Sequence, residues 1–409
     1  MTAWLVEHSG KVFQGTCGWS DPTILQCGRF YPAWVKTAED RLRHYSTVFP
    51  CVECDSSNYA IPSRQRVERW LSCVPQGFIF HFKAFGFFTR KYCPTNNLPR
   101  VIRSDLSVSL QQQSSVKWDE MPVVVREKLW ELFNAALKPM HNANKLGIVV
   151  FQFHLGFGPV VENKQHVLEC RRLLDQDYKM AVEFRNRKWI IESELSKTLG
   201  WLQEHDIGLI CTDELEHELL NLTAPSKASD STVVPIIYEL GSLRFSYIRV
   251  HRRAGKERLL TTDQIERWSE RLQAENIQRC IKGPIFFMWG TDHEDQPIIN
   301  SKHLTAQLRE LAFNWSLNCP KSFGNLLQFC SPLPKTPTAA IAEENEERTT
   351  LSERLVDMSP AKKSKQDKDT QHSTEKSATN ISPLTKKKVE KDKDAHKQLK
   401  VTSFFSKQS

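Results

Sequence analysis

The chain has 409 residues, of which 40% are hydrophobic, and a formal net charge of +8. This length allows two or three average domains, or one large α/β barrel with additional segments. No run approaches the 18 apolar residues of a membrane span, and the first residues lack the pattern of a secretory signal. We therefore expect no membrane association, and we expect the 11 cysteines to be reduced thiols.

Strand-like apolar runs recur along the chain, and stretches with helical spacing separate them. Some runs, such as LGIVVFQF and GPIFFMW, are almost continuous, as expected of strands buried on both faces. The eight runs are Val12–Cys17, Cys51–Cys54, Phe78–Lys83, Leu146–Phe153, Met180–Phe184, Ile207–Cys211, Phe245–Val250 and Ile285–Trp289.

The stretches between these runs place apolar residues on one helical face. Val67, Trp70, Leu71 and Val74 follow the i, i+3, i+4, i+7 pattern of a helix. Alternating strands and helices predict a parallel sheet, and eight such units predict an α/β fold of the TIM-like (β/α)8 barrel type over residues 1–330. A doubly wound open sheet is the alternative. The polar segment 92–123 is long for one connection and is predicted to be an insertion.

The C-terminal part of the chain has a different composition. Residues 351–409 carry six more Lys and Arg than Asp and Glu, so most of the net charge lies there. After about residue 330 the apolar periodicity stops. Such a sequence cannot bury enough apolar surface to offset the entropy of ordering, so we predict a disordered basic linker over residues 331–397.

Charged residues gather at the predicted carboxyl ends of the strands, where barrel proteins carry their active sites. Two interpretations stay open: an ion-pair network that closes the barrel mouth, or an anion site. In the second, cations including Arg252 bind phosphate, while a carboxylate or His251 transfers protons or binds a divalent metal. The candidate catalytic residues are Glu53, Glu183 and His251, and the candidate metal ligands are Glu53, Glu183, Asp213 and His251.

Further residues at these strand ends are candidates for substrate or phosphate binding. Trp19 and Tyr31 are candidate stacking platforms for bases, although single aromatic residues are more often part of a core. The candidate binding residues are Trp19, Tyr31, Tyr59, Lys83, Gln152, Arg185 and Arg249.

Two familiar cofactor motifs find no support in the sequence. Cys51-x-x-Cys54 has zinc spacing, but no second pair follows, and a strand would direct the two sulfurs to opposite faces. A glycine-rich dinucleotide fingerprint and a phosphate-binding P-loop are both absent from the sequence.

Six motifs in fixed order resemble the YecE-like family, domain-of-unknown-function family seventy-two, over about residues 12–315. They are GTCGWS…GRFYP, LRHYSTVFPCVECDSSNYAIPS, W…VPQGFIFHFKA, LGIVVFQF, AVEFRNRKW and SYIRVHRR. The resemblance implies a TIM-like barrel whose mouth contains the binding residues named above together with Glu53, Glu183 and His251. It implies no reaction. The chain departs from the family pattern at Ala60, at Arg252 and at the sequence MWGTD.

The sequence QLKVTSFF at residues 398–405 resembles the PIP-box peptide that docks replication and repair proteins on the sliding clamp PCNA. A short helical turn would place Val401, Phe404 and Phe405 on one side as an apolar plug, while Gln398 would bind a small side pocket. Few residues would need to fold on binding, which limits the entropic cost. A chance match is the alternative.

Two basic clusters, PAKKSK and LTKKKVEK, predict nuclear import, and a solvated run of charges without this role is the alternative. With the clamp peptide, they lead to three hypotheses. The first is a nuclear, PCNA-associated enzyme of DNA replication or repair that processes a phosphodiester or a damaged nucleotide, with divalent metal dependence. The second is a non-catalytic module that binds DNA and the clamp. The third is a small-molecule enzyme that its tail merely localises.

Overall fold

The computed structural model describes residues 11–89, 92–213, 244–251, 256–273 and 283–310. The predicted linker, the predicted clamp peptide and Arg252 lie outside these residues. Among the described residues, no helix is both long and apolar enough to cross a membrane.

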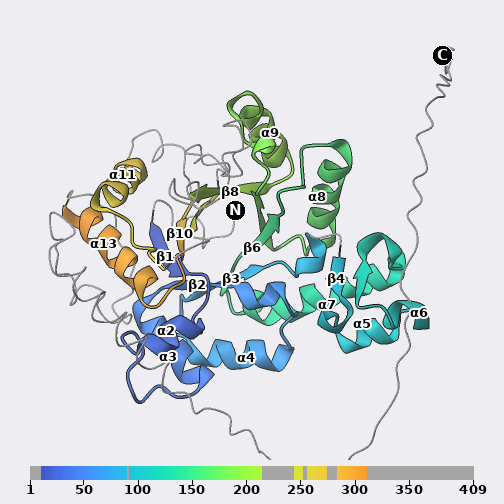
Figure 1. Ribbon diagram of the computed structural model, residues 1–409, viewed down its shortest axis with the longest axis horizontal. Helices are drawn as coiled ribbons and strands as arrows, with labels where there is room; N and C mark the ends of the chain where they lie inside the picture. Colours follow the sequence, from blue (N-terminus) through green and yellow to red (C-terminus); the bar gives the residue numbers. More distant parts are fainter. Residues whose placement is uncertain (1–10, 90–91, 214–243, 252–255, 274–282, 311–409) are drawn as a thin grey trace, which may run out of the picture. The chain divides into compact units, whose positions relative to one another are not determined.

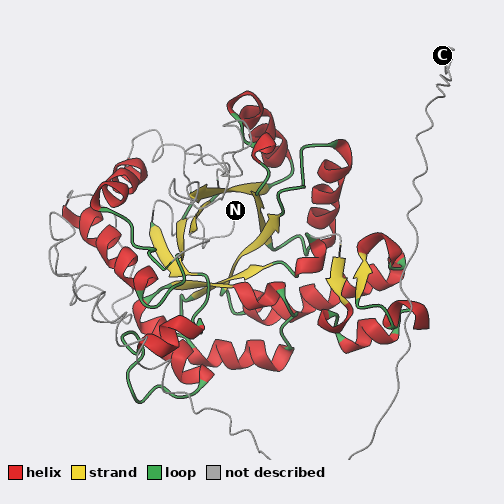
Figure 2. Ribbon diagram, in the orientation of Figure 1, coloured by secondary structure: helices red, strands yellow, loops and turns green. Residues whose placement is uncertain are grey.

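Eight of the described strands form one parallel sheet that curves into a nearly closed barrel (Figure 2). Its hydrogen-bonded order is β1-β10-β9-β8-β7-β6-β3-β2. This confirms the TIM-like barrel, and the open doubly wound sheet is wrong. The strands are β1 Val12–Thr16, β2 Cys51–Cys54, β3 Ile79–Lys83, β6 Leu146–Phe153, β7 Lys179–Phe184, β8 Ile207–Asp213, β9 Ser246–His251 and β10 Ile285–Gly290.

The strands β1 and β2 stand at the two ends of this order, and a tyrosine joins them. Tyr45, in helix α3 (Ala38–Val48), accepts a hydrogen bond from the Thr16 amide at 2.9 Å and donates one to the Cys51 carbonyl at 3.0 Å. The strands also approach closely, because a Cβ added at Gly15 would lie 2.5 Å from the Cys51 carbonyl oxygen. The Tyr45 hydroxyl therefore links the two strands across this seam.

Helices surround the barrel (Figure 1), and their apolar faces pack on the outward side chains of the strands. For example, Trp130 of α7 stacks at 6.1 Å on Phe151 of β6. The amphipathic pattern predicted this burial, and Val67 is fully buried. The longer helices are α4 Arg64–Cys73, α7 Val123–Asn142, α8 Val161–Leu173, α9 Glu192–Glu204, α11 Thr262–Gln273 and α13 Gln296–Glu310, and a shorter one is α2 Pro22–Cys27.

The segment between β3 and α7 contains its own secondary structure. Strands β4 (Tyr92–Pro94) and β5 (Ser115–Lys117) pair antiparallel, apart from the barrel sheet. Two short helices, α5 (Arg100–Ser104) and α6 (Val108–Gln111), lie between them. Because it leaves the carboxyl end of β3, this segment belongs to the side of the barrel that carries the strand ends.

The barrel interior is apolar toward the amino ends of the strands and polar toward their carboxyl ends, which form the mouth. Inward side chains such as Ile79, Ile148, Ile210 and Phe286 form the apolar part. On β2, β7 and β9 the inward position that follows this apolar part toward the carboxyl end is charged: it is Glu53, Glu183 or Arg249. Cys51 packs inside the barrel and Cys54 packs outside it, which confirms that their sulfurs lie on opposite faces.

Candidate functional site

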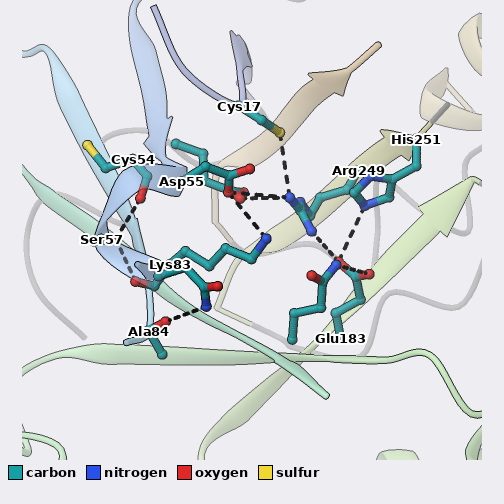
Figure 3. A network of polar contacts seen from close by, with 12 residues as sticks. Cys17, Cys54, Asp55, Ser57, Lys83, Ala84, Glu183, Arg249 and His251 are labelled. Atoms are coloured by element: carbon teal, nitrogen blue, oxygen red, sulfur yellow. Dashed lines mark hydrogen bonds and ion pairs between the residues drawn. The ribbon is translucent and has the colours of Figure 1, made fainter. Parts of the chain in front are cut away.

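An arginine lies at the centre of the mouth, between two buried carboxylates (Figure 3). Arg249 of β9 donates from Nη2 to Glu53 Oε1 at 2.8 Å and from Nη1 to Glu183 Oε2. The side chain of Arg249 is 1% exposed, and those of Glu53 and Glu183 are 0% exposed. A buried charge is stable when it is paired and hydrogen-bonded, so these three side chains form one structural unit.

The inward alternation of the strands explains how these residues meet. Glu53 lies two residues beyond the interior residue Cys51 on β2, and Glu183 lies two residues beyond Ala181 on β7. Arg249 likewise lies two residues beyond Tyr247 on β9. Because strand side chains alternate between faces, each charged group faces inward at the carboxyl end of its strand.

A second set of polar side chains lies nearer to solvent. Arg185 Nε contacts Glu183 Oε1 at 2.5 Å, and Gln152 donates to the same oxygen at 2.7 Å. Lys83 Nζ lies 3.5 Å from Asp55 Oδ1. The exposed fractions are 12% for the Arg185 side chain, 13% for Lys83 and 33% for Asp55, so this set is the part of the mouth that solvent reaches.

The two neighbouring carboxyl groups Glu53 and Asp55 differ in their affinity for a proton. Burial raises the pKa of Glu53 to about 8, although Arg249 opposes the shift, and the nearby Asp55 charge raises it further. Burial also acts to raise the pKa of Asp55, but Lys83 and Arg249 outweigh it and hold that pKa below its ordinary value. At neutral pH, Glu53 therefore holds a proton and Asp55 is ionised.

Glu183 and His251 both have pKa values below their ordinary ones. Burial would raise the pKa of Glu183, but Arg185, Arg249 and His251 together hold it well below its ordinary value. Burial and the neighbouring Arg249 lower the pKa of His251 to about 3. The imidazole is therefore neutral at physiological pH, with Nε2 lying 3.4 Å from both Glu183 Oε2 and Arg185 Nη2.

Four residues of the mouth were not among the candidate site residues, and one of them is Asp55. Tyr247 donates to Glu53 Oε2 at 2.7 Å, and Cys17 Sγ accepts from Arg249 Nη2 at 3.6 Å. Burial raises the pKa of Asp292 to about 7, and the nearby Asp55 charge contributes to that shift. The sequence SYIRVH could have revealed Tyr247, because it lies two residues before Arg249 and shares its face.

The structure brings most of the predicted site residues together, places three of them elsewhere and leaves Tyr59 on the rim of the mouth. Trp19 packs edge-on against Trp70 at 5.3 Å, and Tyr31 donates to the Trp19 carbonyl, so both are core residues. Asp213 accepts from the Trp268 indole of α11 at 2.7 Å, on the outer side of the barrel. Tyr59 is 62% exposed on the rim.

The donor set of the mouth does not fit a metal centre. Among the described residues, no three His, Cys, Asp or Glu side chains are grouped so that they could hold a metal ion. Arg249 occupies one oxygen of Glu53 and one of Glu183, and Asp213 lies outside this group. The four predicted ligands therefore do not form a joint site.

The fold and the mouth define an α/β-barrel protein with a buried ion-pair network at the carboxyl ends of its strands. The chain belongs to the family described as "Protein of unknown function DUF72", whose model matches residues 13–323. This agrees with the resemblance seen in the sequence.

One relative is similar in sequence, and two solved structures support the same fold. The UPF0759 protein YunF of Bacillus subtilis is 29% identical over 204 residues, which are 49% of this chain and 61% of that protein. The crystal structure of a DUF72 family protein from Enterococcus faecalis has a TM-score of 0.53 and 19% identity, covering 73% of this chain and 95% of that one. A DUF72 family protein from Thermotoga maritima gives 0.52 and 21%, covering 74% and 99%.

Proposed function

We propose that the barrel mouth binds the phosphate group of a ligand, and that the protein acts in nuclear DNA replication or repair while tethered to PCNA. The observation that carries the first part is the layered mouth. Lys83 and Arg185 are partly exposed above the buried unit of Glu53, Arg249 and Glu183. The second part of the proposal, clamp binding and a nuclear location, is supported by the sequence of the tail alone.

The charges of the mouth favour an anion. With Glu53 protonated at neutral pH, Lys83, Arg185 and Arg249 face two ionised carboxylates, Asp55 and Glu183. Asp292, whose pKa is about 7, contributes part of one further negative charge. The remaining positive charge suits a phosphate, and the planar guanidinium of Arg185 suits its oxygens.

A proton donor is the second requirement for processing a phosphodiester. The Glu53 carboxyl, with a pKa of about 8, holds a proton near neutral pH, and the Asp55 side chain that acts on it is 33% exposed. We propose that water attacks the phosphorus atom as the P–O bond breaks, that this pair gives a proton to the leaving oxygen, and that the proton released by the attacking water returns to the pair. The neutral His251 offers a hydrogen-bonding nitrogen on the opposite side of Arg249.

A calorimetric titration of the full chain with inorganic phosphate tests the binding proposal. We expect Lys83→Gln and Arg185→Gln to weaken phosphate binding at least tenfold. Lys188→Gln is the matched control, because Lys188 is an exposed cation close to Arg185 in the sequence and has the same charge. Equal effects of all three changes would mean that phosphate binds nonspecifically, and the mouth would not be its site.

Clamp binding has its own test. The full chain is titrated with purified PCNA and compared with a Phe404→Ala, Phe405→Ala variant. Binding that disappears in the variant supports the replication or repair role, whereas an intact chain that does not bind PCNA removes the reason for it. Absence of PCNA binding would favour the third hypothesis, a small-molecule enzyme.

A non-catalytic binding module remains the second candidate, and one observation favours it. Glu53 and Glu183 each have both carboxylate oxygens bonded to protein groups, so the network is closed on itself. Turnover of branched or damaged DNA by the full chain, lost in Glu53→Gln, would decide for the enzyme. Phosphate binding without turnover under any metal condition would decide for the module.

A further inference from the structure

Exposed large apolar side chains gather on one side of the barrel. Each one among the described residues lies in a segment between the carboxyl end of a strand and the following barrel helix, or in the first turn of that helix. They are Trp34, Tyr59, Tyr92, Val101, Val108, Val123, Val124, Leu155, Val160 and Val161. These side chains therefore lie on the side of the barrel that carries the mouth.

Around the mouth, two of these side chains alternate with the two outer cations. The neighbouring strands β2, β3, β6 and β7 are followed or ended in turn by Tyr59, Lys83, Leu155 and Arg185. Tyr59 and Leu155 are 62% and 45% exposed, whereas Lys83 and Arg185 are 13% and 12% exposed. The apolar groups therefore protrude and the cations are recessed between them. We call these four residues the rim strip.

Hydrogen bonds hold the backbone of the rim strip in place. Ser57, two residues before Tyr59, donates to the Lys83 carbonyl at 2.6 Å, and Asn58 donates to the Ala84 carbonyl at 2.9 Å (Figure 3). On the other side, Asn186 donates to the Leu155 carbonyl at 2.7 Å. The backbone of the rim strip is thus held in place by hydrogen bonds before a ligand binds, which lowers the entropic cost of binding.

We infer that the rim strip binds single-stranded nucleic acid, with a base against Tyr59 and phosphates at Lys83 and Arg185. This inference rests on the proposed phosphate site and names its substrate class. Aromatic side chains stack on the faces of unpaired bases, and cations between them follow the backbone. A duplex hides its base faces and holds its phosphates on a rigid outer surface, so it would contact Tyr59 and Leu155 without reaching the recessed cations.

The test is fluorescence anisotropy of the full chain with a labelled 20-nucleotide DNA strand, the same sequence as RNA, and the corresponding DNA duplex. We expect at least one of the single strands to bind at least tenfold more tightly than the duplex. The RNA arm shows which sugar the strip accepts. Equal or tighter binding of the duplex would overturn the inference.

Variants assign the binding to the rim strip. Tyr59→Ala should weaken single-strand binding about tenfold, and Tyr59→Phe should retain it because the stacking ring remains. The matched control is Tyr92→Ala, which removes a similarly exposed aromatic side chain (54%) from β4 and should leave binding unchanged. All variants carry the same basic tail, so its lysines contribute equally to each. An equal loss in Tyr59→Ala and Tyr92→Ala would overturn the assignment.

Titration with inorganic phosphate separates this inference from the proposed function. Tyr59→Ala should leave phosphate binding unchanged, whereas Lys83→Gln should weaken both phosphate and single-strand binding. Phosphate binding at Lys83 without a preference for single strands would overturn the inference and leave the proposed function intact. Absence of phosphate binding at the mouth would overturn both.

Discussion

The hydroxyl of Tyr247 donates a 2.7 Å hydrogen bond to Oε2 of Glu53 inside the barrel, where neither side chain is accessible to solvent. The ring of Tyr247 packs edge-on against His81 at 5.0 Å, which fixes its position above the apolar interior. Arg249 donates to the other oxygen of Glu53. The tyrosine therefore connects the apolar lower barrel with the charged mouth.

Tyr247→Phe should reduce stability more at pH 9 than at pH 6. The lost donor stabilises the ionised form of Glu53, and Glu53 ionises above its pKa of about 8. Urea unfolding at both pH values measures this, with an expected loss of about 1–3 kcal/mol at pH 9. The control is Tyr178→Phe, which loses a 3.0 Å hydrogen bond to the neutral Asn134 carbonyl. Equal losses at both pH values in Tyr247→Phe would contradict the role given to the hydroxyl.

Arg249→Met should be among the most destabilising single substitutions in the barrel. It leaves Glu53 and Glu183 buried without their shared cation, which costs about 3–5 kcal/mol of unfolding free energy. Adding Glu183→Gln should restore part of the lost stability, because it removes a carboxylate charge that would otherwise stay buried without Arg249. Arg172→Met, which breaks an exposed pair with Glu169, should have no measurable effect. Denaturant titrations of the three variants and the unchanged protein would contradict the network if the double variant were no more stable than Arg249→Met.

The sequence predicted all eight barrel strands because each is a short apolar run with a helical pattern on either side. The spacing of Glu183 and Arg185 also predicts a shared face, since residues two apart on a strand share one. Their contact of 2.5 Å agrees with this prediction. These features depend on local spacing alone.

Which face of a strand points into the barrel could not be read from the sequence. Strands buried on both faces are apolar on both, so their pattern does not separate inside from outside. Asp213 illustrates this, because it shares a face with the outward Cys211 and contacts Trp268 of α11. Trp19 and Tyr31 lie in a loop, where no periodicity indicates direction, and both pack in the core.

Glu53→Gln should remove a pH dependence of stability. The folded chain holds the Glu53 proton up to about pH 8, whereas the unfolded chain releases it near 4.5. The folded state binds more protons between these values, so stability falls as pH rises through this window, by at most about 1.4 kcal/mol per pH unit. Urea unfolding of both proteins at pH 6 and pH 8.5 measures the difference. An unchanged slope in Glu53→Gln would show that the carboxyl titrates at its ordinary value.

Gly15→Ala should destabilise the barrel at the seam between β1 and β2. The added Cβ would lie 2.5 Å from the Cys51 carbonyl oxygen and 2.9 Å from Cys51 Sγ, so the strands must separate. We expect a loss of about 1–3 kcal/mol, as for other overpacked cores, and weaker hydrogen bonding of the Tyr45 hydroxyl that bridges the seam. Gly200→Ala in α9 is the control, because nothing lies within 4 Å of its added Cβ. That substitution should raise stability by about 0.5–1 kcal/mol, since alanine favours a helix over glycine. Thermal and denaturant unfolding compare the two, and a Gly15→Ala variant as stable as Gly200→Ala would mean that the seam is looser than its geometry indicates.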